Sequence, residues 1–120
     1  MTVAALSTFR QALSGCEIAV LADISAGSVL AWDSALKWPQ EQLDALCDLA
    51  SRALSIGAPL PTTAVVADAL GCQVFIRIAA NSDEVLCGVF APDQDLDDVL
   101  MEGRRFCTVL DAQDTSEGPT

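Results

Sequence analysis

Hydrophobic residues recur at helical intervals in three segments of this chain. Leu6, Phe9 and Leu13 have the i, i+3, i+7 spacing of one apolar helix face. Residues 39–55 combine a polar stripe with apolar positions over far more than one narrow face. This pattern predicts a long helix that packs on the sheet and also on a second surface, such as a partner helix. Residues 93–110 have aspartates in the first turns and arginines near the end, an order that complements the helix dipole and predicts a closing helix.

Five other segments have the patterns of strands. Residues 72–79 are the clearest, because apolar side chains at every second position alternate with a mixed set on the other face. Residues 16–23 are apolar on both faces apart from Glu17, as in a strand that is covered on both sides. The predicted strands are residues 16–23, 28–33, 63–67, 72–79 and 84–90.

The order of these elements, αββαβββα, predicts an α+β fold. We expect a three-layer sandwich in which one five-stranded antiparallel sheet has helices on both faces. Residues 1–110 contain no internal repeat and no linker, so we expect them to form a single domain. Residues 111–120 are polar and lack an apolar anchor, which predicts a disordered acidic tail.

Charge and hydropathy narrow the classes of partner. The formal net charge of −11 repels phosphate backbones and anionic lipids, so we expect no binding to nucleic acid and none to membranes. The longest uncharged stretch, residues 53–67, is broken by glycine and prolines and is too short to span a bilayer. The first basic residue, Arg10, follows the first apolar run, unlike the order in a signal peptide. We therefore expect a soluble, cytoplasmic protein.

The residues needed for most catalytic sites are missing. The chain has no histidine, which excludes histidine-based triads and histidine metal sites, and it has no glycine-rich phosphate-binding loop. Its carboxylate pairs are better explained as helix caps and solvated residues. We expect no catalytic residue, no cofactor and no metal. The five cysteines are odd in number and widely spaced, which is typical of core residues in a reducing compartment: Cys16, Cys47, Cys72, Cys87 and Cys107.

The segment from Gly15 to Asp23, followed by Gly27 and the apolar residues 29–31, resembles the roadblock/dynein light-chain family. In that family a first helix ends just before such a strand, and an Asp-to-Gly turn leads into a second apolar strand. The long helix, the strand pair 72–90 and the closing helix extend the resemblance over most of residues 5–110. Its motifs are patterns of small and aliphatic residues without invariant chemistry.

The resemblance implies a homodimer. In the family the third strand is a sheet edge that pairs with its copy, and the long helix packs on its two-fold mate. The doubly apolar character of residues 39–55 agrees with this arrangement. A short uncharged edge strand would also be an aggregation hazard if it stayed unpaired. The corresponding interface residues in this chain are Leu43, Leu46, Cys47, Ala50, Leu54, Thr63, Val65 and Ala67.

The resemblance also implies a non-enzymatic partner of a Ras-like small GTPase, or a scaffold in motor or trafficking complexes. Bacterial members of the family often act beside a GTPase. We expect Trp32, Trp38 and Phe75 to contact a partner, because aromatic residues are enriched at binding hot spots. Alternatively, the two tryptophans cover an end of the core. Two other functions remain open: a sensory domain of a related αβ sandwich that binds a small apolar ligand, and an enzyme with a cysteine or carboxylate centre.

Overall fold

The predicted order of helices and strands is confirmed by the computed structural model of the chain, which describes residues 2–57, 61–68, 71–80 and 82–116. The helices are α1 (Thr2–Gln11), α2 (Gln40–Ala53) and α3 (Leu96–Ser116). The strands are β1 (Cys16–Asp23), β2 (Ser28–Ser34), β3 (Thr63–Asp68), β4 (Gly71–Arg77) and β5 (Glu84–Phe90).

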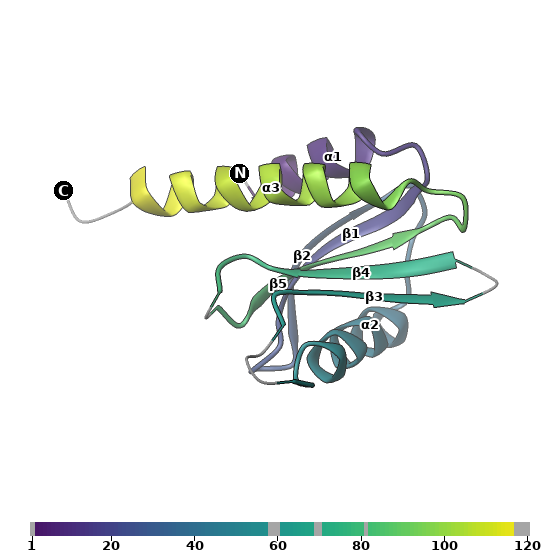
Figure 1. Ribbon diagram of the computed structural model, residues 1–120, viewed down its shortest axis with the longest axis horizontal. Helices are drawn as coiled ribbons and strands as arrows, with labels where there is room; N and C mark the ends of the chain where they lie inside the picture. The colour runs from purple at the N-terminus through teal and green to yellow at the C-terminus, as the bar shows by residue number, and fades with distance from the viewer. Residues whose placement is uncertain (1, 58–60, 69–70, 81, 117–120) are drawn as a thin grey trace.

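The strands form one antiparallel sheet in the order β2-β1-β5-β4-β3. β1 and β5 are neighbours inside the sheet although they come from opposite parts of the chain, while β2 and β3 form its two edges. Helix α2 covers one face of the sheet, and α1 and α3 cover the other (Figure 1). The predicted α+β sandwich with helices on both faces is therefore confirmed.

Alternation along the strands sends side chains into two separate cores. Beneath α1 and α3, the ring of Phe9 meets the rings of Phe90 and Phe106 edge-on, with centroids 6.3 and 6.2 Å apart. On β4, Val74 points into this core, whereas Phe75 points into the core beneath α2. Each face of the sheet is thus sealed by its own helices, which explains why the central strands are apolar on both faces.

Helix α3 begins later than its sequence pattern predicts. The Oδ1 atom of Asp95 accepts a hydrogen bond of 2.8 Å from the backbone N–H of Asp97 and a longer one of 3.4 Å from that of Asp98. A side chain that accepts these bonds is a helix N-cap, so the helix begins at Leu96 rather than near residue 93.

The other end of α3 extends beyond the predicted boundary of the domain. The helix continues to Ser116, where the sequence pattern predicted disorder from residue 111 onward. Adding residues to an existing helix costs far less than starting one, so a polar segment can continue it. Residues 117–120 of the predicted tail lie outside the described residues. Among the described residues, no helix combines the length and the apolar composition that a membrane crossing requires.

Candidate interaction surface

β3 is an edge strand whose hydrogen-bonding direction follows from its register. The Arg77 amide donates to the Thr62 carbonyl at 2.8 Å, and the Ile78 amide donates to the Glu84 carbonyl at 3.0 Å. In an antiparallel ladder, successive residues of one strand bond to opposite neighbours. With Ala64 paired to Phe75 and Val66 to Gln73, these residues of β3 bond to β4. The intervening residues then direct their N–H and C=O groups away from β4.

Three of the predicted interface residues are these outward-directed ones: Thr63, Val65 and Ala67. Their side chains lie on the α3 face of the sheet, because their partners Ile76, Val74 and Cys72 belong to the core beneath α1 and α3. All three are exposed, and the side chain of Val65 is 43% exposed. The pairing of β3 with β4 has no bulge, and residues 63–67 carry no charge. This edge therefore offers a straight, uncharged template for another strand.

The opposite edge, β2, is less suited to pairing. Its register with β1 shifts between Leu21 and Ala22, which marks a bulge. Bulges and charges are the devices with which proteins protect sheet edges. On β2, Asp33 forms an ion pair with Arg10 of α1 at 2.6 Å, so part of this edge is tied to the protein's own helix. Of the two edges, β3 is the open one.

The inner face of α2 is occupied by the protein's own core. Five side chains predicted for the dimer interface are at most 6% exposed and pack on the sheet: Leu43, Leu46, Cys47, Ala50 and Leu54. This corrects their assignment, because side chains that fill the protein's own core leave almost no surface for a second copy, although Leu46 also lines the groove described next. An apolar helical pattern does not distinguish the residues that face the sheet from those that flank them.

The surface left on α2 is its flank on the β4 and β5 side. A groove of about 320 Å³ runs between this flank and the sheet, with Ala45 exposed and Leu49 half-buried along it. Ile56, just beyond the helix, is 75% exposed. The predicted helix ends at residue 55, just before Ile56, although Ile56 follows Leu49 by seven positions, or about two helical turns. The groove is lined by Trp38, Gln42, Ala45, Leu46, Leu49, Gln73 and Val89.

The three aromatic residues predicted to contact a partner lie in different surroundings. Trp38 lines the α2 groove and is half-buried, packing against the α2 core. Trp32 on β2 is 40% exposed and lies across from Val20. Phe75 is fully buried between β4 and α2, so it cannot contact a partner. The prediction for Phe75 is wrong because this face of β4 is covered by α2.

The cysteine side chains are held in their neutral form. Burial raises the pKa of the Cys16 thiol to about 12 and raises the pKa of the Cys87 thiol even further. Burial also raises the pKa of Cys47, Cys72 and Cys107. A thiol must ionise to act as a nucleophile or a metal ligand, so these residues are poor candidates for either role. Within the described ranges, no three Cys, Asp or Glu residues are grouped so that they could hold a metal ion.

Solved structures with the same architecture come from several bacteria. A Roadblock/LC7 domain from Streptomyces avermitilis superposes with a TM-score of 0.79 at 16% identity, covering 92% of this chain and 95% of that one. This protein has the roadblock fold. The fold is shared with Myxococcus xanthus MglB, at a TM-score of 0.78 and 12% identity over 96% of this chain and 95% of that one.

A third structure with the roadblock fold is the gliding protein MglB from Thermus thermophilus. Its TM-score is 0.75 at 23% identity, covering 91% of this chain and 84% of that one. No family model matches the sequence, and no curated protein matches it either. The likeness therefore lies in the arrangement of the elements, while the residues that fill the roadblock fold are mostly different in this chain.

Proposed function

We propose that this protein is a non-enzymatic, homodimeric roadblock module that regulates or scaffolds a Ras-like small GTPase. The observation that carries the dimer is the straight edge of β3, uncharged from Thr63 to Ala67, beside the apolar flank of α2. An edge of this kind attracts another strand, and pairing with a copy of itself satisfies its backbone groups. The strand that fits it best is another β3.

The register of β3 defines how two copies would pair. A two-fold axis at Val65 places Val65 opposite its copy and Thr63 opposite Ala67 of the second protomer. Each of these residues directs its N–H and C=O groups outward, so each facing pair exchanges two backbone hydrogen bonds. Moving the axis along the strand leaves at least one of the outward residues unpaired. The proposed dimer is thus centred on Val65.

The same two-fold axis brings the α2 helices together. Because the axis is perpendicular to the sheet, both α2 helices lie on one face of a continuous sheet, and their apolar flanks face each other across the β3 pair. The small side chain of Ala45 allows close approach, while Leu49 supplies apolar area. Burying such area stabilises the dimer by about 25 cal/mol per Å² before the costs of association are subtracted.

The GTPase part of the proposal rests on resemblance. The roadblock/dynein light-chain pattern implies a Ras-like small GTPase as partner, and the solved structures that share this fold include a gliding protein. The neutral, buried thiols also favour a binding role over nucleophilic catalysis.

A single cysteine substitution tests the dimer. In the proposed register the two Cα atoms of residue 65 lie about 5.5 Å apart, within disulfide range. We expect Val65→Cys to form a covalent dimer under mild oxidation. Val66→Cys is the matched control, because residue 66 faces residue 64 of the second copy and its own copy lies out of disulfide range. The oxidised variants and the wild type are compared on non-reducing gels. A monomeric Val65→Cys, or equal cross-linking of both variants, would contradict the register.

A separate experiment tests the GTPase. The immobilised protein is offered candidate small GTPases loaded with GDP or with a non-hydrolysable GTP analogue, and bound GTPase is quantified. We expect retention that depends on the nucleotide. Hydrolysis and nucleotide exchange are then measured with the purified pair. If no GTPase is retained in either state while the dimer forms, the dimer stands and the GTPase role fails.

A further inference from the structure

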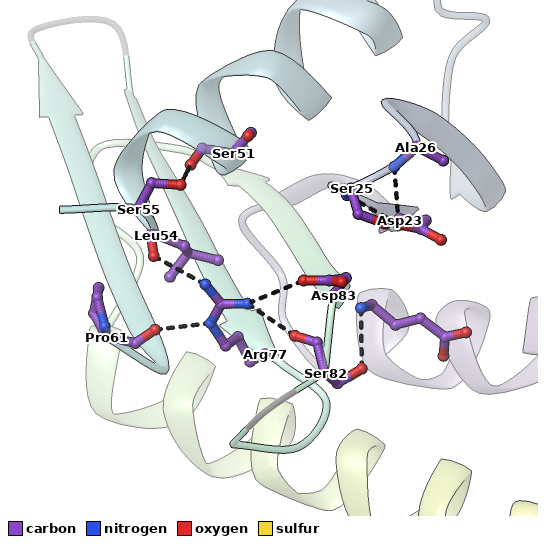
Figure 2. Close-up of polar contacts among 11 residues, drawn as sticks. Asp23, Ser25, Ala26, Ser51, Leu54, Ser55, Pro61, Arg77, Ser82 and Asp83 are labelled. Atoms are coloured by element: carbon purple, nitrogen blue, oxygen red, sulfur yellow. Dashed lines mark hydrogen bonds and ion pairs between the residues drawn. The ribbon is translucent and has the colours of Figure 1, made fainter. Parts of the chain in front are cut away.

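Arg77, at the end of β4, is a buried cation that bonds mainly to neutral groups. It is 7% exposed, and its guanidinium donates to three backbone carbonyls, those of Pro61 at 3.0 Å, Ser82 at 2.8 Å and Leu54 at 2.9 Å (Figure 2). The nearest carboxylate, on Asp83, is 4.0 Å away and belongs to a side chain that is 58% exposed. Arg77 is therefore not primarily half of an ion pair.

The three carbonyls belong to separate segments of the chain. Leu54 is the C-cap of α2, and Pro61 lies just before β3. Ser82 lies in the connection between β4 and β5. The backbone amide of Arg77 adds a fourth bond, to the Thr62 carbonyl at 2.8 Å. One residue thus connects the end of α2 with the beginning of β3.

A buried guanidinium is costly, and an apolar side chain of similar volume often gives equal or greater stability. The cost is offset here because the guanidinium forms hydrogen bonds that an apolar side chain cannot form. Its nitrogens donate to carbonyls in three directions, and its charge faces the C-terminal, negative end of the α2 dipole. Lysine keeps the charge but has a single nitrogen, which cannot replace the guanidinium.

We propose that Arg77 is a positioning residue for the dimer interface. Its guanidinium holds the apolar flank of α2 at the height and angle at which both α2 and the β3 edge meet a second copy. The inference rests on the proposed homodimer. Residues that only stabilise the fold change the free energy of unfolding, whereas a positioning residue also changes the affinity between folded protomers.

The test measures the dimer dissociation constant of folded protein by sedimentation equilibrium. We expect Arg77→Lys to raise the dimer dissociation constant about tenfold, because a displaced α2 flank loses contacts with the second copy. Arg77→Met should raise it at least as much. Arg105→Lys is the matched control, because Arg105 lies on α3, on the opposite face of the sheet from α2, and pairs with Glu102 of the same helix, its side chain 65% exposed. Circular dichroism at the same temperature establishes that each variant is folded.

The outcomes separate this inference from the proposed dimer. A monomeric wild type overturns both. A dimeric wild type with an unchanged constant in folded Arg77→Lys and Arg77→Met overturns only the role of Arg77. Failure of both variants to fold also overturns it, since Arg77 would then be a determinant of the fold. A raised constant in the Arg77 variants and an unchanged one in Arg105→Lys support it.

Discussion

The ring of Phe90 lies where a side chain on Gly88, two residues earlier on β5, would begin. A Cβ atom built on Gly88 would be 2.5 Å from Cε2 and 2.6 Å from Cζ of this ring. The ring cannot simply move away, because it packs edge-on against Phe9, which in turn packs against Phe106. Glycine is therefore required at this position by the packing of the core beneath α1 and α3.

We expect Gly88→Ala to destabilise the protein by about 1–3 kcal/mol, the usual cost of overpacking a well-filled core. Alanine has the higher strand propensity, so a purely local effect would have the opposite sign. Urea unfolding followed by tryptophan fluorescence measures the difference. A variant as stable as the wild type would show that the Phe90 ring has room to shift.

The sequence predicted the fold through patterns that depend on neighbours along the chain. β1 and β5 have the predicted bounds, and the two faces of β4 are those that the alternation indicated. Contacts that join distant segments were not predictable. The hydrogen bonds from the Arg77 guanidinium to the carbonyls of Leu54 and Pro61 produce no periodic pattern in the sequence. By its position alone, Arg77 is an ordinary polar residue on an alternating strand.

Some features of the predicted interaction residues could be identified from the local sequence, and others depended on contacts between distant segments. The strand that holds Thr63, Val65 and Ala67 was predictable from its run of small and β-branched residues, whereas its place at a sheet edge was implied by the resemblance to the roadblock/dynein light-chain family. Phe75 was misassigned because a sheet covered on both faces has no solvent-facing side, so alternation cannot tell a contact residue from a core residue. Leu49 and Ile56 needed the orientation of α2 on the sheet, which only the structure provides.

The ion pair between Arg10 and Asp33 should contribute measurably to stability. The two side chains are only 19% and 22% exposed, and their 2.6 Å contact fastens α1 to the edge strand β2. In a double-mutant cycle with Arg10→Met and Asp33→Asn, we expect a coupling energy of about 1 kcal/mol, at the upper end for partly exposed pairs. The coupling should weaken at high salt.

The chain provides a control for this cycle. Arg52 and Asp48 form an i, i+4 pair on α2 whose side chains are 70% and 68% exposed. We expect their cycle to give about 0.3–0.5 kcal/mol, as for other exposed helix pairs. Equal coupling energies for the two cycles would indicate that the burial of Arg10 and Asp33 adds nothing to their interaction.

The buried thiols make the protein sensitive to alkaline pH. Burial raises the pKa of Cys16 from 9.0 to about 12. Above pH 9 the unfolded chain releases this proton while the folded protein keeps it, so the unfolded state binds fewer protons and stability falls as the pH rises. Below pH 9 the contribution is fully present. Each such thiol lowers the free energy of unfolding by up to roughly 1.4 kcal/mol per pH unit above that point.

The measurement is urea unfolding in reducing buffer between pH 7 and 10.5. Cys16→Ala removes one ionising thiol and should make the alkaline decline less steep, even if the variant is less stable at pH 7. The chain contains no tyrosine, so phenol ionisation does not add to the decline. Parallel pH profiles for the variant and the wild type would show that Cys16 ionises alike in both states.

A lysine on either sheet edge distinguishes the two edges. Val65→Lys places a charge at the centre of the proposed β3 pair, where it would face its own copy, and lysine on an edge strand is a common barrier to pairing. We expect the variant to be monomeric by light scattering. The side chain of Val65 is already 43% exposed, so the fold itself should lose little stability.

Leu30→Lys is the control, because Leu30 is 50% exposed on β2, the edge interrupted by a bulge. That variant should keep the oligomeric state of the wild type. If instead Leu30→Lys dissociates the protein while Val65→Lys does not, the copies meet at β2 and the α2 flank is not part of their interface.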